Sequence, residues 1–82
     1  MTLNQNQPQK IDIGLAVRKK MDEHGTTVAW LAMKINCDES NLRKHLHKEH
    51  IYPELLIKIS ISLKTDFFIY YSQYVLQSIE NK

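Results

Sequence analysis

The 82-residue chain is poor in the residues that cross-link or interrupt small folds, with one cysteine, two glycines and two prolines. The single cysteine, Cys37, cannot form an internal disulfide, and this usage favours a cytoplasmic protein. With so few glycines and prolines there are few candidate tight turns, which disfavours sandwiches and barrels built from many short strands. These absences favour a helical fold.

Long apolar runs and a strong charge of one sign are missing as well. Apolar runs such as residues 67–71 are far shorter than the roughly 18 residues that cross a bilayer, and no basic and then apolar leader opens the chain. We therefore expect no membrane partner. The net charge of +2 does not by itself indicate nucleic-acid binding, because the distribution of charge over the surface decides it.

Signatures of catalysis are missing too. The chain has no Ser/His/Asp set, paired-carboxylate motif or phosphate-binding glycine loop, and it is too short for a roomy pocket. His45, His47 and His50 are close in sequence, but residues two apart on a helix point in different directions and no cysteine pair or carboxylate completes a ligand set. We expect no enzymatic activity, cofactor, metal or small-molecule ligand.

What is present is the composition of one ordinary globular domain, 43% hydrophobic and 24% charged. Residues 1–10 are polar and rich in Asn and Gln, which predicts a flexible arm. The sequence then divides into a helical domain over 11–66 and an aromatic helix over 67–82.

Capping residues and apolar spacing predict the helices. Asp12 can cap a helix over 13–24 that stops at Gly25, and Pro53 suits the first position of a fourth helix. Arg18 on the first helix is assigned a structural role. The apolar faces expected to be buried are Ile13, Val17 and Met21; Val28, Leu31, Ala32 and Ile35; Leu42 and Leu46; and Leu55, Leu56, Ile59 and Leu63.

Two segments leave alternatives open. Residues 55–63 also alternate between apolar and polar side chains as a strand does, so periodicity alone does not assign them. Asp66 can cap a last helix running to about Ile79, whose apolar residues occupy more than one face. That helix could complete the core, form a two-fold dimer seam, or do both.

The region from Thr27 to Lys48 has the pattern of a helix-turn-helix. Two closely crossing helices need a small residue at the crossing, and Ala32 supplies it. The turn between them needs a residue that accepts positive φ, a small apolar residue and a helix cap, and Asn36, Cys37 and Asp38 stand in that order.

Over residues 11 to about 68 the chain resembles the phage-repressor-like (XRE or Cro-type) helix-turn-helix family. Asn36 stands where the family usually has glycine, and His45 where it has a buried apolar residue, with Leu46 beside it to take over the burial. The resemblance implies an all-α, compact five-helix bundle of the lambda-repressor type, in which 55–63 is helical. It rests on Thr27-Val28-Ala29-Trp30-Leu31-Ala32, Cys37-Asp38-Glu39-Ser40-Asn41-Leu42 and Leu55-Leu56-Ile57-Lys58-Ile59-Ser60-Ile61-Ser62-Leu63.

The resemblance further implies that a helix over about 39–47 lies in the major groove of double-stranded DNA. The expected base-contacting residues are Glu39, Ser40, Asn41 and Lys44, and the expected phosphate-contacting residues are Thr27, Arg43, His47 and Lys48. A plainer interpretation is that these side chains form a polar first turn and a solvated face.

The expected function is sequence-specific transcription regulation by a homodimer joined through the C-terminal helix, with half-sites about 34–36 Å apart. The alternative is a protein-interaction module, antitoxin-like or an adaptor, that holds a partner through the last helix and Trp30 and binds DNA weakly or not at all.

Overall fold

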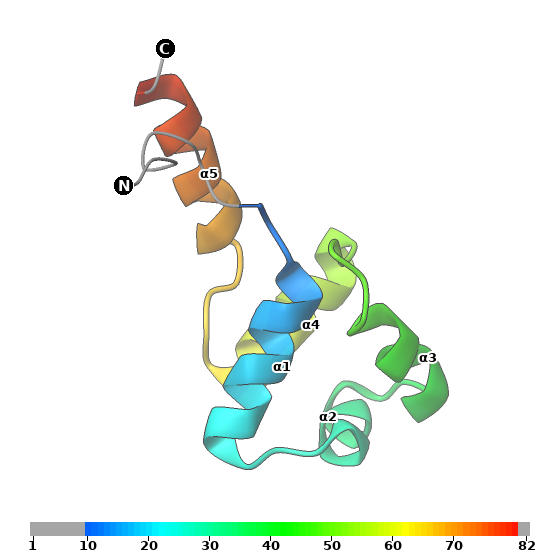
Figure 1. Ribbon diagram of the computed structural model, residues 1–82. Coiled ribbons are helices and arrows are strands. Elements are labelled where there is room, and N and C mark those ends of the chain that lie inside the picture. Colours follow the sequence, from blue (N-terminus) through cyan, green and yellow to red (C-terminus); the bar gives the residue numbers. More distant parts are fainter. Residues whose placement is uncertain (1–9, 81–82) are drawn as a thin grey trace.

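The computed structural model describes residues 10–80, and this range holds five helices and no strand (Figure 1). The expected all-helical class is confirmed, and residues 55–63 are helical rather than extended. The flexible arm expected over 1–10 lies, except for Lys10, outside the described residues. The helices are α1 (Ile13–His24), α2 (Val28–Ile35), α3 (Glu39–His45), α4 (Pro53–Leu63) and α5 (Ile69–Glu80).

Side-chain caps start the first three helices where the sequence predicts. Asp12, Thr27 and Asp38 each accept a hydrogen bond from the backbone amide three residues further on, at 3.1, 3.0 and 2.9 Å respectively. Each bond satisfies an amide that the helix itself leaves without a partner. Helix α4 has no side-chain cap and begins with Pro53, whose missing amide proton needs none.

Three helices end with the same left-handed residue geometry. Gly25, Asn36 and Lys64 follow α1, α2 and α4 with φ of 67°, 58° and 53°. At each end, the backbone amides of the left-handed residue and of the residue after it donate hydrogen bonds to carbonyls of the last helical turn. This is the Schellman arrangement. The first two stops were predicted from sequence. The stop at Lys64 was not, because lysine has no special preference for this conformation.

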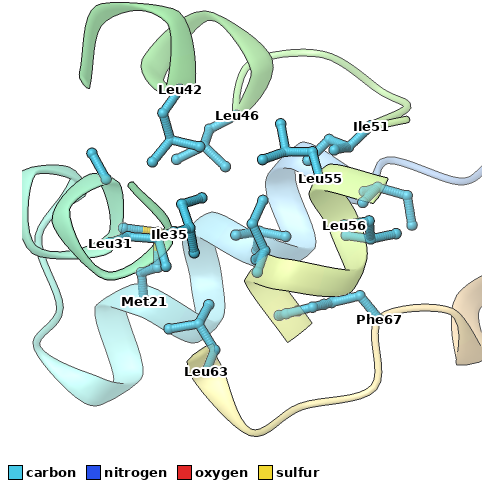
Figure 2. Close-up of a cluster of buried hydrophobic side chains, with 14 residues drawn as sticks. Met21, Leu31, Ile35, Leu42, Leu46, Ile51, Leu55, Leu56, Leu63 and Phe67 are labelled. Carbon is cyan, nitrogen blue, oxygen red and sulfur yellow. The ribbon is translucent and has the colours of Figure 1, made fainter. Parts of the chain in front are cut away.

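The core is formed by α1–α4 together with Phe67. Figure 2 shows side chains from all four helices converging, with Phe67 and Leu42 toward opposite sides of the cluster. Every apolar position that the spacing predicts to be buried is buried, except Val28, which is half-buried. The other buried hydrophobic side chains between residues 10 and 80 are those of Ile51 and Phe67, which lie outside the helices.

The helices packed most closely against α2 are α3 and α4. Ala32, on α2, is buried. Figure 1 shows α5 projecting from the α1–α4 body on the side away from α2 and α3. The described chain is accordingly elongated, 43 × 25 × 21 Å along its principal axes. Between residues 10 and 80 no helix has the length and apolarity needed to cross a membrane.

The last helix starts later than the sequence predicts. The Asp66 carboxylate accepts from the amide of Phe68 (2.9 Å), two residues on, and so closes a turn instead of capping a helix at 67. The Phe67 ring is fully buried in the core, and this burial fixes the backbone at Phe67, so the helix can begin only beyond it. Helix α5 therefore begins at Ile69, and it contributes no buried residue.

Candidate nucleic-acid interface

Helices α2 and α3 are joined by the three-residue turn 36–38. The amide of Cys37 donates to the carbonyl of Ala32 (3.0 Å), which folds the chain back at once after the left-handed Asn36. Cys37 is half-buried against the core. Burial, followed by the nearby Asp38 carboxylate, raises the pKa of the Cys37 thiol. The thiol is therefore protonated at neutral pH and acts as a small apolar side chain.

Helix α3 is sharply divided between a buried side and an exposed side. Leu42, and Leu46 just after the helix, are each about 1% exposed. The four residues expected to contact bases are all exposed and lie within the first two turns, so the structure brings them together on one short helix. They are Glu39, Ser40, Asn41 and Lys44.

The helix is shorter than the expected 39–47, because it ends at His45. The amides of His47 and Lys48 bond to carbonyls three residues back, which is the tighter turn common at helix ends. His45 itself is half-buried, and its ring meets the ring of Tyr52 edge-on at 5.5 Å. Leu46 takes over the burial, as the sequence predicts.

Helix α1 holds the chain where it leaves α3. The amides of Ile13 and Gly14 donate to the carbonyls of Glu49 and Lys48, at 2.7 and 3.0 Å. One turn further along, Arg18 Nε donates to the carbonyl of Leu46 at 2.9 Å. Carbonyls of the segment 46–49, which follows α3, thus accept hydrogen bonds from α1, and Arg18 has the structural role expected of it.

Gly14 supports the candidate interface by close packing and was not expected from the sequence. A Cβ atom on Gly14 would lie 2.3 Å from the carbonyl oxygen of Lys48 and 2.4 Å from that of Leu46. Only a residue without a side chain lets α1 approach this backbone. The available signal was a glycine inside an otherwise regular helical pattern, which usually has a packing reason.

Beside α3 lies an open hollow of about 340 Å³ between the end of α1, the start of α2 and the end of α3. Thr27, Arg43 and His47, three of the four residues expected to contact phosphate, line this hollow together with Arg18. Lys48, the fourth, is exposed but is not part of the lining. The other lining residues are Met21, Asp22, Thr26, Val28 and Leu46.

One charge pair on α3 joins the two predicted classes of contact residue. The Arg43 guanidinium donates to the Glu39 carboxylate at 2.6 Å, across one helical turn. The spacing of four residues made this pair foreseeable, although the two residues were expected to have separate roles. With Arg43 beside it, Glu39 does not present an uncompensated negative charge next to the hollow.

Two of the histidines near α3, His45 and His50, have aromatic partners. The ring of His50 stacks on that of Tyr71 at 5.9 Å, and His50 Nδ1 is hydrogen-bonded to the Tyr71 hydroxyl at 3.0 Å. Over residues 10–80, no three His, Cys, Asp or Glu side chains gather in a way that could hold a metal ion. Comparisons with models of protein families, with curated proteins and with solved structures found no match to this chain.

Proposed function

We propose that this protein is a sequence-specific, helix-turn-helix DNA-binding regulator that inserts α3 into the major groove. One observation carries the proposal: α3 buries Leu42, and the chain just after it buries Leu46, while the opposite side of α3, exposed and polar, adjoins a hollow bordered by two arginines. A helix whose inner side is packed against the core in this way presents only its outer side chains to a groove. The N-terminal part of such a helix is the part that reaches base edges.

The exposed side chains have the chemistry for base recognition. Asn41 can bind adenine through two hydrogen bonds, Lys44 can donate to guanine O6 and N7, and Glu39 can accept from cytosine N4. Ser40 can donate or accept and is permissive. The side-chain amide of Asn41 is free for this task, because it is the backbone amide of Asn41 that donates the capping hydrogen bond to Asp38.

The hollow is the proposed seat of a DNA phosphate. Arg43 has further N–H groups besides the one donated to Glu39, and the Thr27 hydroxyl keeps its proton because it acts as acceptor in its capping bond. His47 completes the rim and Lys48 supplies a further cation nearby. Such contacts fix the register of a protein on DNA and carry no base preference.

Selection from a random duplex library tests the proposal. We expect enrichment of one motif, with an affinity that falls steeply as salt rises. The reason is that cationic side chains of the protein release counterions from the DNA phosphates, and this release is less favourable at high salt. A library that returns no motif after several rounds would overturn sequence-specific recognition.

Two substitutions separate base contacts from phosphate contacts. Asn41→Ala should relax the preference at one base position, at a cost of about 1–3 kcal/mol on the preferred site. Lys48→Ala should weaken binding to all sequences and lower the salt slope by about one. The matched control is Lys19→Ala, an exposed lysine on α1 outside the hollow. Equal, sequence-independent losses from Asn41→Ala and Lys48→Ala would contradict direct readout.

A second candidate function is that of a protein-interaction module, antitoxin-like or an adaptor, with weak or no DNA binding. The observation that favours it is the exposed apolar surface, which includes six side chains of α5 and, on α2, Trp30 and Met33. Salt dependence distinguishes the two functions, because phosphate contacts make DNA affinity steeply dependent on salt. Flat or absent DNA binding beside a tight protein partner would favour this second function.

A further inference from the structure

The exposed side chains of α3 leave the helix in different directions. At 3.6 residues per turn, Ser40 and Lys44 each lie about 160° around the helix from the buried Leu42, and so face away from the core. Glu39 and Arg43 lie together on one flank, about 60° and 100° from Leu42. Arg43 lines the hollow and Glu39 does not. Glu39 is therefore placed beside Arg43 and not on the outward side of the helix.

The Glu39 carboxylate is already engaged along this flank. Its Oε2 accepts a hydrogen bond from the Arg43 guanidinium at 2.6 Å. The Glu39 and Arg43 side chains are 47% and 56% exposed, and an ion pair at so exposed a site contributes little to stability. Its main consequence is the position of the guanidinium, because an unpaired arginine side chain samples many rotamers.

We propose that Glu39 is a positioning residue, which holds the Arg43 guanidinium at the edge of the hollow for a DNA phosphate and does not itself read a base. The inference rests on the proposed DNA-binding function and changes the role of Glu39 within it. The other N–H groups of Arg43 are left for the phosphate. An arginine that is ordered before binding also loses less conformational entropy when the complex forms.

A positioning role and a base-reading role for Glu39 have different signatures. A carboxylate that accepts from cytosine N4 discriminates at one base pair, whereas a phosphate contact affects all sequences alike. A contact from Glu39 to cytosine does not need Arg43, but positioning does. Without Arg43, the unpaired carboxylate would repel the DNA backbone. The loss of affinity caused by removing Glu39 should therefore depend on whether Arg43 is present.

A double-mutant cycle over Glu39→Ala and Arg43→Ala tests the inference. The affinity of all four proteins is measured on the duplex motif that the wild type selects and on its single-base variants. We expect Glu39→Ala to weaken binding to all these duplexes by about threefold or more, with the base preferences unchanged. In the Arg43→Ala background, the same substitution should no longer weaken binding.

Glu23→Ala is the matched control. Glu23 is an exposed acid on α1 outside the hollow, and its carboxylate pairs with Lys20 at 3.2 Å. Its removal changes the net charge as Glu39→Ala does, so the comparison cancels the general effect of charge on DNA affinity. The effect of Glu23→Ala should be the same with and without Arg43. Without DNA, the side-chain NMR signals of Arg43 should shift in Glu39→Ala and not in Glu23→Ala.

Glu39→Gln provides a conservative variant should Glu39→Ala unfold α3, which far-UV circular dichroism would show. The glutamine carbonyl can still accept from Arg43, so this variant should lose less affinity than Glu39→Ala and keep the same base preferences. A retained preference together with a partial loss supports positioning. A preference that changes at one base pair in Glu39→Gln contradicts it.

Three results would overturn the inference while leaving the DNA-binding function in place. They are a change of preference at one base pair in Glu39→Ala, a loss of affinity that persists in full in the Arg43→Ala background, and Arg43 side-chain signals that do not respond to Glu39→Ala. A wild-type chain that selects no motif would instead overturn the DNA-binding function itself, and this inference with it.

Discussion

Helices α4 and α5 are nearly equal in length, 11 and 12 residues, and both are rich in apolar residues. Yet α4 buries Leu55, Leu56, Ile59 and Leu63, and α5 buries nothing. The apolar residues that α4 buries lie on one face, and that face meets α2 and the rest of the core. Apolar content alone therefore does not decide whether a helix belongs to the core of a small domain.

The two helices differ in where the residues that precede them lie relative to the core. Helix α4 starts at Pro53, two residues after the buried Ile51, and runs into the centre of the core. Helix α5 starts after Phe67, whose side chain already fills the end of the core, so the apolar residues of α5 lie outside the core. Only Tyr71, in its first turn, packs against the core.

The strongest test of this comparison truncates one leucine in each helix. Leu56→Ala removes a fully buried side chain and should lower the free energy of unfolding by about 2–5 kcal/mol. Leu76→Ala removes a side chain that is 55% exposed and should change it by less than about 0.5 kcal/mol in the monomer. Urea unfolding at low micromolar concentration measures both. Equal losses would show that α5 is part of the cooperative core.

A smaller effect is expected where α1 approaches the end of α3. Gly14→Ala forces a Cβ atom onto two backbone carbonyls and should cost about 1–3 kcal/mol. It should also displace the segment that carries Lys48, so DNA binding should weaken. The control is Gly25→Ala, where the added Cβ meets nothing but φ is positive, at a cost of about 1 kcal/mol.

Thermal unfolding and amide chemical shifts of residues 46–49 distinguish these two glycine variants. We expect shift changes in this segment for Gly14→Ala and only near residue 25 for Gly25→Ala. Undisturbed shifts over 46–49 in Gly14→Ala would mean that α1 and this segment separate without cost, which would contradict the close approach.

The smallest effect is expected at the contact between α5 and the body. Tyr71→Phe removes the hydroxyl bonded to His50 and should cost less than about 1 kcal/mol at neutral pH. Burial raises the pKa of Tyr71 above its usual value of 10.0. The neutral phenol is therefore favoured in the folded state, and stability is lost as pH rises above 10 because the unfolded chain ionises first.

Urea unfolding between pH 9 and 11 checks this sign. The wild type should lose more stability than Tyr71→Phe over that range, since the other three tyrosines are common to both proteins. A Tyr71→Phe variant that loses as much as the wild type would show that Tyr71 ionises equally in both states.

The sequence predicts what short-range chemistry controls. The caps at Asp12, Thr27 and Asp38 and the left-handed stops at Gly25 and Asn36 depend on neighbours within a few residues, and all five were foreseeable. The buried faces of the first four helices follow from the spacing of apolar residues in the same way.

Features that depend on distant neighbours were not predictable from one sequence. The need for Gly14 exists only because the carbonyls of residues 46 and 48 approach α1, and the late start of α5 follows from the insertion of Phe67 into a core built by other helices. In the candidate interface, the exposure of Asn41 and Lys44 follows from burial of Leu42. The hollow joining Thr27 to Arg43 needs the tertiary fold.

The way α3 is held has a consequence for how this protein can change. At seven residues the helix is too short to be stable alone. It is held by the buried Leu42, by the buried Leu46 just after it, and by hydrogen bonds from α1 to backbone carbonyls of the segment 46–49 that follows it. Backbone bonds do not depend on which side chains the outer positions carry. The exposed residues of α3 can therefore be exchanged with little cost in stability, so under the proposed DNA-binding function a new base preference can arise here without a new fold.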